Sequence, residues 1–407
     1  MIETVKIQSL GAQGDGVTAE GVFVPGTLPG EVVRISTTGH RARLLDVIEP
    51  SLERRTGDEA GAHASGACTM WHASDAFLAR WKVDLIAQAL ESRGINDVQL
   101  LPIMTSPPES RRRATFTGRR TKKKIIVGYH TERSEQIVPA DTCQALHPAI
   151  CAALPRFEEL VGTGASRKGE MRLAVTSTQE GLDVAVTGGK PVEGPLYGQL
   201  VAIAATSDFA RLTWDGEPVV TRRPPTVSMG RARVTPPPGG FLQATEHAQY
   251  ALTDAVLSAV GDARRIADLF AGSGTFALPL AEGAEVHAVE GDQDAVDALD
   301  QAWRQTTGLR RVTTEVRDLH RRPVLAREFK NITAVVFDPP RAGARAQCEQ
   351  IAQTEILRIA AVSCNPATFA RDARILIDGG YRLDWVQPID QFLWTPHVEL
   401  AAGFSKT

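Results

Sequence analysis

The sequence has 407 residues, a formal net charge of −3 and hydrophobic and charged fractions that are ordinary for a globular protein, so we expect a sizeable core and two or three domains. No run approaches the roughly 18 apolar residues of a membrane helix, and the start, MIETVKIQSL, has no signal-peptide pattern. We therefore expect a cytoplasmic protein without a membrane partner. The five cysteines are odd in number and scattered, which argues against a disulfide framework and leaves thiols for chemistry or metal binding.

In chain order, residues 1–52 alternate short β-rich runs with Gly and Pro turns, which predicts a small barrel. Such barrels often bind oligonucleotides, although a purely structural barrel fits the pattern equally well. Residues 75–95 carry apolar positions at helical spacing and predict an amphipathic helix. The rest of residues 53–235 is mostly strands and turns, and a Pro/Gly-rich stretch at 221–240 predicts a boundary or a shaped connector.

A basic segment, SRRRATFTGRRTKKKIIVGYH at residues 110–130, contains no acidic residue. One interpretation is a track for RNA phosphates, with Phe116 or Tyr129 as a stacking partner; a solvated face is the alternative. The basic side chains of this segment are Arg111, Arg112, Arg113, Arg119, Arg120, Lys122, Lys123 and Lys124.

Residues 236–407 alternate strand-like runs with helical ones, which predicts a parallel sheet with helices on both faces. The runs RRIADLF, AEVHAVEG, RVTTEV, ITAVVFDPP and ILRIAAVSC are the expected strands. Ligands bind at the carboxyl ends of the strands in sheets of this kind, so the residues at those ends are the first candidates for a site.

One β-α-β unit, DLFAGSGTFALPLAEGAEVHAVEGD, has the pattern of a nucleoside site. Gly272 and Gly274 permit a tight turn, and Glu290 ends the next strand, where its carboxylate can accept both hydroxyls of a ribose. A glycine-rich structural turn is the alternative. Because Phe276 replaces the third glycine of the dinucleotide fingerprint, S-adenosylmethionine fits this pattern better than NAD.

Two further expected strands end in reactive side chains. VVFDPPRAG ends on Asp338, and the two prolines that follow hold it at the rim of the crevice. AVSCNPATF ends on Cys364, close to the start of a helix that would favour the thiolate. Taken alone, Cys364 is better explained as a tolerated cysteine; beside Asp338 and the nucleoside turn, a reactive thiol is the better interpretation.

The blocks DLFAGSGTFALPLA, VEG, FDPPRAGA, SCNPATFARD and TPHVELAAGF resemble, in this order, the signature blocks of the RNA uridine-5 methyltransferase family, which makes 5-methyluridine in ribosomal RNA and tRNA. The resemblance covers residues 240–407. GDGVTAEGVFVPGTLPGEVVRI resembles the TRAM domain, an RNA-binding barrel of many ribosomal-RNA members, and TCQALHPAI and GACTMWHASDAF resemble blocks of the family's central domain. The implied domains are a TRAM-like (OB-like) β-barrel at 1–52, a β-rich RNA-recognition domain at 53–235 and an α/β Rossmann-like class I methyltransferase domain at 236–407. The helix at 75–95 is expected to pack on the last of these.

The resemblance also implies roles for individual residues. Cys364 matches the nucleophile that adds to carbon 6 of uracil, and Glu399 matches the base that later removes the proton from carbon 5. Asp318 is a weaker match on the adenine side of the cofactor. The positions that match the S-adenosylmethionine site are Gln243, Phe270, Gly272, Gly274, Thr275, Glu290, Asp318 and Asp338.

The sequence departs from the family at its iron–sulfur cluster. Of the three clustered cysteines of ribosomal-RNA members only Cys68 is present, with Ser65 and Glu59 at the other two places, while Cys143 matches the fourth. Two cysteines cannot hold a cubane cluster, so we expect none. The alternatives are a vestigial site in which Cys68 and Cys143 lie close together, or another metal that recruits His63 or His72.

The leading hypothesis is therefore a monomeric enzyme that methylates carbon 5 of a uridine in RNA, with 23S ribosomal RNA favoured over tRNA. Cytosine-5 methylation uses the same cysteine chemistry and is one alternative. A non-catalytic RNA-binding assembly factor is another, favoured only by the missing cluster ligands.

Overall fold

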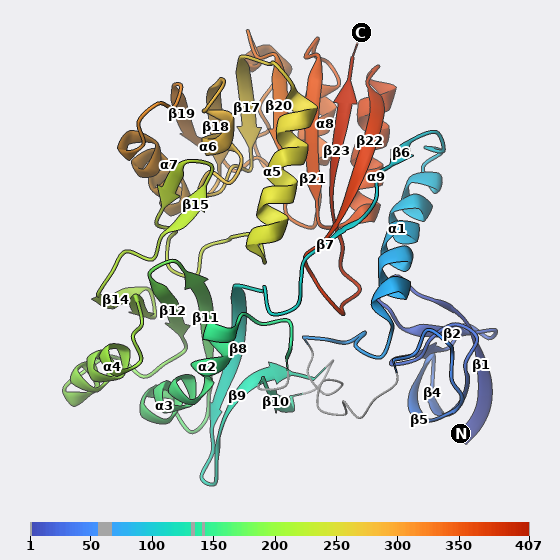
Figure 1. Cartoon of the computed structure of the whole chain (residues 1–407), viewed down its shortest axis with the longest axis vertical. Coiled ribbons are helices and arrows are strands. Elements are labelled where there is room, and N and C mark those ends of the chain that lie inside the picture. The colour runs from blue at the N-terminus through green and yellow to red at the C-terminus, as the bar shows by residue number, and fades with distance from the viewer. Residues whose placement is uncertain (1, 56–66, 132–134, 141–142, 407) are drawn as a thin grey trace.

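The N-terminal part of the computed structural model is a closed barrel (Figure 1). The structure describes residues 2–55, 67–131, 135–140 and 143–406. Alternating residues of the strands, such as Val33 and Ile35, fill the barrel's interior, and this confirms the predicted barrel. Its strands are β1 (Ile2–Leu10), β2 (Gly16–Thr18), β3 (Phe23–Val24), β4 (Val32–Thr38) and β5 (Arg41–Glu49).

The central part is a seven-stranded sheet in the order β10-β9-β8-β11-β12-β13-β14. The strands are β8 (Arg113–Arg120), β9 (Ile125–His130), β10 (Ile137–Pro139), β11 (Glu170–Thr178), β12 (Gly181–Thr187), β13 (Arg211–Trp214) and β14 (Glu217–Thr221). Helices α2 (Pro148–Ala152), α3 (Leu154–Gly164) and α4 (Pro195–Thr206) accompany this sheet. None of these three helices was predicted from the sequence. Helices α2 and α4 begin at a proline, α3 has a proline at its second position, and α4 is apolar nearly all round, so it shows little helical periodicity.

The C-terminal part is a nine-stranded sheet in the order β19-β18-β17-β20-β21-β23-β22-β6, with β7 also pairing with β22. The five expected strands are parallel neighbours, but β23 runs antiparallel to both β21 and β22. The five predicted strands thus form the parallel sheet that was expected, and an antiparallel β-hairpin, which the sequence did not predict, extends it at one edge. The strands are β6 (Gln99–Leu100), β7 (Met104–Thr105), β17 (Arg265–Leu269), β18 (Glu285–Glu290), β19 (Val312–Val316), β20 (Ala334–Phe337), β21 (Arg358–Ser363), β22 (Arg382–Asp390) and β23 (Glu399–Ser405).

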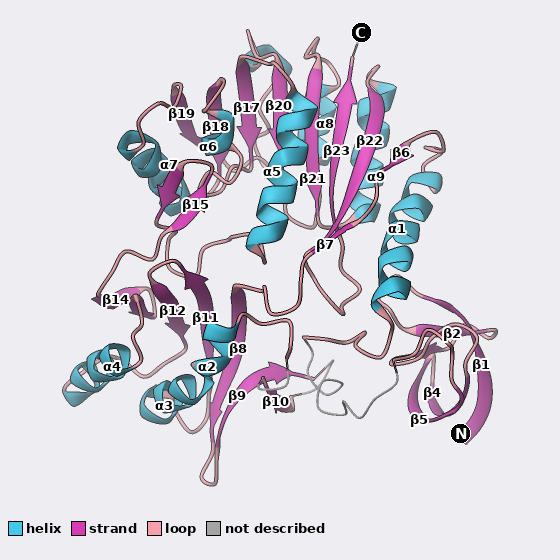
Figure 2. Ribbon diagram, in the orientation of Figure 1, coloured by secondary structure: helices cyan, strands magenta, loops and turns pink. Residues whose placement is uncertain are grey.

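Helices cover both faces of this sheet, as predicted: α5 lies in front of it and α8 and α9 lie behind it (Figure 2). The helices are α5 (Glu246–Val260), α6 (Ala277–Leu280), α7 (Gln293–Gln305), α8 (Arg345–Ile351) and α9 (Pro366–Asp378), with a 3-10 turn at Ala326–Glu328. None of the helices among the described residues is long and apolar enough to cross a membrane.

Two segments outside residues 236–407 are built onto the C-terminal sheet. Helix α1 (Asp75–Glu91), capped by Ser74, packs against α9 and β22, and the strands β6 and β7 that follow it pair with β22. The Pro/Gly-rich stretch contains a small hairpin, β15 (Val227–Met229) and β16 (Ala232–Val234), which packs against α7. Lys82 on α1 is fully buried and forms an ion pair with Asp390 at the end of β22, 2.7 Å between Nζ and Oδ2.

Candidate functional site

The register of the parallel strands gathers three of the predicted residues. Leu269 of β17 pairs with Val289 of β18 on one side and with Phe337 of β20 on the other. The residues that follow these three are therefore neighbours at the carboxyl edge of the sheet. They are Phe270, Glu290 and Asp338, all predicted to bind the cofactor.

The antiparallel register places the two predicted catalytic residues opposite each other. Ser363 of β21 pairs with Leu400 of β23, so the next residues outward are Cys364 and Glu399. The antiparallel direction of β23 brings the two residues together, because Glu399, the first residue of β23, lies beside the carboxyl end of β21. Cys364 stands at that end because Asn365, whose side chain caps α9, turns the chain directly after the strand.

The glycine-rich turn after β17 has the backbone that the nucleoside pattern requires. Gly272 has φ 54° and Gly274 has φ 98°, and a Cβ on Gly274 would meet Leu278 at 2.9 Å. The Gly272 amide donates to Oε2 of Glu290 at 2.9 Å, which ties the turn to β18. Phe270 also has a positive φ, 61°, a strain typical of functional turns. Thr275 is buried within the turn; Asp318, beyond β19, is exposed.

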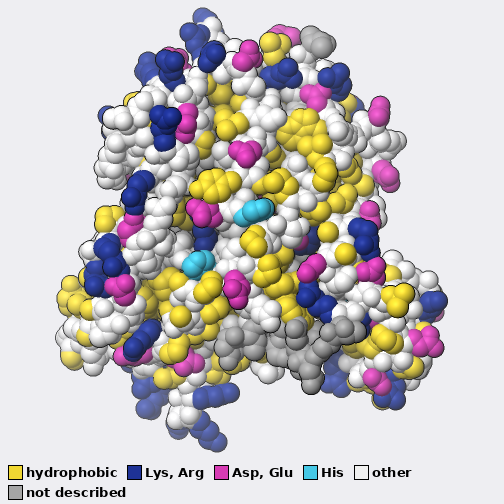
Figure 3. All heavy atoms as spheres, viewed as in Figure 1, with side chains coloured by type: hydrophobic (Ala, Val, Ile, Leu, Met, Phe, Trp, Pro, Cys, Tyr) yellow, Lys and Arg dark blue, Asp and Glu magenta, His cyan; other side chains and the backbone are white. Residues whose placement is uncertain are grey.

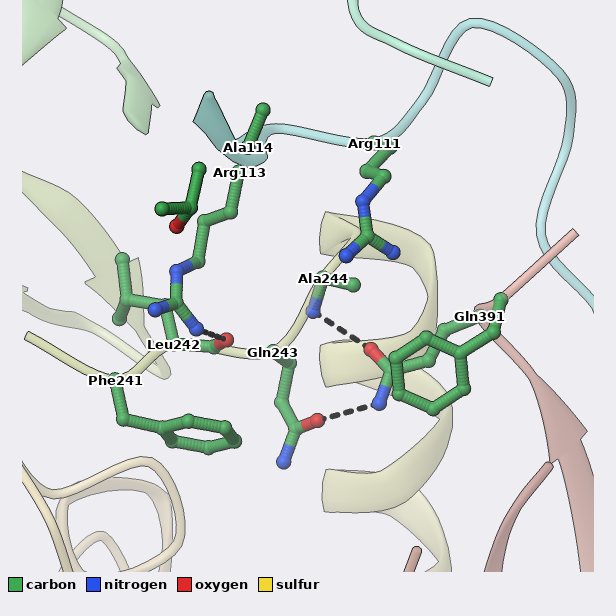
Figure 4. A pocket seen from close by; sticks show the side chains of 10 residues that line it. Arg111, Arg113, Ala114, Phe241, Leu242, Gln243, Ala244 and Gln391 are labelled. Carbon is green, nitrogen blue, oxygen red and sulfur yellow. Dashed lines mark hydrogen bonds between the residues drawn. The ribbon is translucent and has the colours of Figure 1, made fainter. Parts of the chain in front are cut away.

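A chain of side-chain hydrogen bonds connects the predicted cofactor residues with Glu399, the predicted base. Gln243 donates from Nε2 to Oδ2 of Asp338 at 3.2 Å, and its Oε1 accepts from Nε2 of Gln391 at 2.7 Å. The same Nε2 of Gln391 donates to Oε2 of Glu399 at 2.9 Å. Figure 4 shows the contact between the two glutamines and the backbone amide of Ala244 that donates to Gln391 Oε1.

The carboxyl groups of the site are buried close together, and this favours their neutral forms. Burial raises the pKa of Asp338 to about 7, although the hydrogen bond from Gln243 opposes the shift. Burial and the neighbouring Asp338 hold the pKa of Glu399 well above its usual range. The pKa of Asp268 on β17 is also raised well above its usual range by burial and by Asp338. A cationic ligand bound at this edge would stabilise the ionised forms of these carboxyl groups.

The electrostatics of Cys364 differ from the expectation. Burial, together with the nearby Glu399 and Asp338, raises the pKa of its thiol to about 11, against the lowering effect of Arg341. The start of α9 therefore does not produce a ready thiolate. A half-buried sulfur that faces two carboxyl groups loses more from desolvation and repulsion than it gains from the helix terminus.

Two polar residues of the site were missed by the sequence analysis. Both oxygens of Asp268 are buried without a hydrogen-bond partner among the described residues. Its position near the end of an expected strand, directly before the glycine-rich turn, was a signal that could have identified it. Gln391 carried no signal, because only the tertiary structure brings the loop after β22 beside Gln243.

Part of the predicted phosphate track is instead a junction between domains. Arg112 is buried and donates to Oε1 of Gln249 at 2.6 Å and to the Gln243 carbonyl at 3.2 Å, so its role as an RNA contact is wrong. Arg113 donates to the Leu242 carbonyl at 2.7 Å, and burial lowers its pKa to about 10. Arg112 is thus held by the C-terminal domain and is unavailable to a phosphate, whereas Arg113 is partly buried and lines the hollow described below.

Phe116 is likewise fully buried, packed on Phe157 and Tyr129, and cannot stack on a base. The exposed members of the basic segment lie at the tip of the β8–β9 hairpin, and Figure 3 shows Lys and Arg side chains gathered at that end of the molecule. They are Lys122, Lys123 and Lys124.

A hollow of about 240 Å³ lies where the central and C-terminal domains meet (Figure 4). Its wall includes Arg111 and Phe241, and its lining reaches Gln243 and Gln391 of the hydrogen-bond chain. The guanidinium of Arg111 lies over the ring of Phe392, 5.8 Å from its centre. A substrate that enters here would approach the catalytic edge between a cation and aromatic rings.

Cys68 and Cys143 lie close together, as one of the alternatives proposed. Their sulfurs are 3.4 Å apart and buried, and the hydrogen bond from Cys68 lowers the pKa of Cys143 to about 7. Glu59, His63 and Ser65 lie outside the described residues. Within the described ranges, no group of three or more His, Cys, Asp or Glu side chains could hold a metal ion.

Comparisons with known proteins show the family of this chain. The model of the tRNA (Uracil-5-)-methyltransferase family matches residues 238–406. Over 99% of both chains the sequence is 44% identical to an uncharacterized RNA methyltransferase of Rhizobium meliloti, and over 100% of both it is 39% identical to one of Caulobacter vibrioides. The chain belongs to the family of S-adenosylmethionine-dependent RNA (uracil-5-) methyltransferases.

A more distant member of this methyltransferase family and one solved structure match along nearly the whole chain. The 23S rRNA (uracil(1939)-C(5))-methyltransferase RlmD of Nitrosococcus oceani is 29% identical over 100% of this chain and 96% of its own. The tRNA (uracil-54, C5)-methyltransferase of Pyrococcus abyssi, solved with S-adenosyl-L-homocysteine, aligns with a TM-score of 0.74 and 22% identity over 98% of this chain and 99% of its own. The latter likeness shows that the three-domain fold is shared.

The residues at the sheet edge fit the family's methyl donor. S-adenosylmethionine carries an ammonium and a sulfonium group, and Asp268, Glu290, Asp338 and Glu399 place carboxyl groups around one edge.

Proposed function

We propose that this methyltransferase acts on carbon 5 of a uridine in 23S ribosomal RNA through a covalent adduct between Cys364 and carbon 6. The observation that supports the proposal most is the register of β21 and β23, which sets Cys364 opposite Glu399 beside the cofactor edge. A nucleophile and a base on opposite strands can reach adjacent carbons of one ring.

In the proposed reaction, the Cys364 thiol loses its proton to solvent, its sulfur adds to carbon 6, and the electron pair of the carbon 5–carbon 6 double bond becomes available at carbon 5. S-adenosylmethionine would supply the methyl group that carbon 5 takes and would keep the electron pair of the broken sulfur–methyl bond. Glu399 then removes the remaining proton from carbon 5, the pair from that bond restores the double bond, and the carbon–sulfur pair returns to Cys364. The raised pKa of Glu399 makes it a strong base once it is ionised.

We assign the other predicted residues to cofactor binding on the basis of their places in the fold. Glu290 ends the second strand of the nucleoside unit, and Phe270, Gly272, Gly274 and Thr275 form the turn between the strands. Gln243 and Asp338 are held together by their hydrogen bond. Asp318 follows β19 on the outer side of Glu290, which suits the adenine end.

The choice of ribosomal RNA over tRNA rests on the relative named as a 23S rRNA methyltransferase. The target uridine must be splayed from its helix or lie in a loop to reach the buried edge. For the backbone of that RNA, we propose contacts to Arg111 at the domain junction and to the exposed Lys122, Lys123 and Lys124.

We also propose that the enzyme works without an iron–sulfur cluster, because only Cys68 and Cys143 remain of the four ligand positions. Protein purified without oxygen should be colourless. A brown sample with absorbance at about 400 nm would refute this point.

Mapping 5-methyluridine by mass spectrometry in total RNA, from cells with and without the protein, tests the proposed function. Loss of one site from 23S ribosomal RNA is the expected result. Loss of a tRNA site would identify tRNA as the substrate instead, and an unchanged map would refute the proposed function.

A further inference from the structure

Gln391 occupies the centre of the hydrogen-bond chain at the catalytic edge. It follows β22 directly and is 2% exposed. Its amide oxygen accepts from the backbone N–H of Ala244 at 2.7 Å, and its amide nitrogen donates to both Gln243 and Glu399. Among the described residues, Gln391 is the single hydrogen-bond partner of the Glu399 carboxyl group.

The backbone N–H of Ala244 sets the direction of the whole chain. Because a backbone N–H can only donate, it fixes the Gln391 oxygen as the acceptor and turns the nitrogen toward Glu399. That nitrogen can only donate, so Oε1 of Gln243 must accept from it. The nitrogen of Gln243 then faces Asp338. One peptide group thus orients two side-chain amides and, through them, two carboxyl groups.

The backbone on either side of Gln391 is also held in place. Lys82 pairs with the carboxylate of Asp390 at 2.7 Å and donates to the carbonyl of Phe392 at 3.1 Å. The backbone N–H of Ser106 donates to the carbonyl of Asp390 at 2.8 Å. These anchors come from α1 and from the segment after β7, so residues outside the C-terminal domain help to fix Gln391.

We propose that Gln391 is the positioning residue for the elimination half of the reaction: it holds one oxygen of Glu399 so that the other meets the proton on carbon 5. This inference rests on the proposed function. In that step Glu399 takes the proton, the carbon–hydrogen pair forms the double bond and the carbon–sulfur bond breaks toward Cys364. Gln391 forms and breaks no covalent bond; it sets the direction of the base.

The geometry makes a specific kinetic prediction. Without the amide, Glu399 keeps its place on β23 but loses the contact that directs its carboxyl group. Loss of the amide also frees Gln243, so the affinity for S-adenosylmethionine should weaken. At saturating S-adenosylmethionine, adduct formation and methyl transfer should change within about threefold, because Cys364 is untouched. Removal of the proton should slow by about 10- to 100-fold, because misplacement of a catalytic group by about 1 Å has an effect of this size.

The test uses the full-length Gln391→Met variant in single-turnover assays with the mapped RNA and labelled S-adenosylmethionine. Met preserves the volume and removes the amide. The expected result is near-normal transfer of label into a denaturant-resistant protein–RNA complex that persists about 10- to 100-fold longer than in wild type. The matched control is Gln387→Met on the same strand, whose amide bonds the Pro102 carbonyl outside the site and whose loss should leave the complex short-lived.

Equal slowing of methyl transfer and complex breakdown, together with a lower melting temperature, would reduce Gln391 to a structural residue and overturn the inference. Unchanged kinetics would also overturn it. If Gln391→Met does not fold, Gln391→Asn answers the same question, because its amide is one methylene too short to reach both Ala244 and Glu399; normal breakdown in that variant would contradict the inference. Wild-type protein that forms neither the complex nor 5-methyluridine would refute the proposed function itself.

Discussion

The carboxyl edge of the C-terminal sheet and the tip of the β8–β9 hairpin carry charge in opposite ways. At the edge, Asp338 and Glu399 are buried, share a hydrogen-bond chain and have raised pKa values. At the tip, Lys122, Lys123 and Lys124 are exposed to solvent. The ionisation of buried carboxyl groups depends on pH and on individual hydrogen bonds, whereas the interactions of exposed charges depend on salt concentration. Substitutions in the two regions should therefore have their effects in different assays.

The largest expected effect is at the edge. Cys364→Ala removes the proposed nucleophile, so turnover should fall by roughly 10⁴-fold or more and covalent capture of RNA should disappear. Labelled methyl transfer and denaturing gels measure the two quantities. Cys151→Ala, a half-buried cysteine on α2 away from the site, is the control and should retain activity.

The reactivity of Cys364 should depend steeply on pH. Its pKa is raised to about 11. At any pH below that value, raising the pH by one unit increases the thiolate fraction about tenfold, so the fraction should increase about 1000-fold from pH 7 to pH 10. Peptide mass spectrometry after brief iodoacetamide treatment measures the rate for this cysteine alone. A rate that is already constant above pH 8 would show a thiolate stabilised by the start of α9.

Glu399→Gln should separate the two halves of the reaction. Methyl transfer should persist while turnover falls by about 10²- to 10³-fold, since the proton on carbon 5 is no longer removed efficiently. The trapped protein–RNA complex should accumulate on denaturing gels. Glu355→Gln, an exposed carboxylate beside Lys406, is the control. Loss of all adduct in Glu399→Gln would remove Glu399 from the role of the base.

Cofactor affinity should change with pH across the pKa of Asp338, which is raised to about 7. The carboxyl group is neutral below this pH and anionic above it, and a cationic ligand prefers the anion. The dissociation constant for S-adenosylmethionine should therefore fall by about tenfold from pH 6 to pH 8, as calorimetry can measure. Asp338→Asn should bind weakly at both pH values. The exposed Asp254→Asn should keep the wild-type profile.

The smallest effect is expected at the hairpin. Replacing Lys122, Lys123 and Lys124 by Ala should weaken RNA binding irrespective of sequence and reduce the slope of log affinity against log salt by up to about 2 to 3. Filter binding at several salt concentrations measures the slope. Arg264, Arg265 and Lys330, exposed at the opposite edge of the C-terminal sheet, form a matched triple. An unchanged slope in the hairpin variant would show that these lysines are solvated and do not contact RNA.

The sequence by itself determined the order of the three parts, the strand ends and the identity of most residues at the site. It could do so because glycines at a turn, prolines after Asp338 and an Asn-Pro helix start after Cys364 are local signals. Membership of a known family added Glu399, which no local pattern distinguishes from a surface carboxylate.

Only the tertiary structure decided which polar groups meet. In the folded chain β23 runs antiparallel to β21, so Glu399 lies opposite Cys364. Arg112 is buried at a domain junction, and Gln391 lies between Gln243 and Glu399. It also reversed the expectation for the Cys364 thiol, because desolvation and repulsion act through neighbours that are distant in the chain. Local patterns record backbone preferences, whereas burial and long-range contacts set the charge and direction of a side chain.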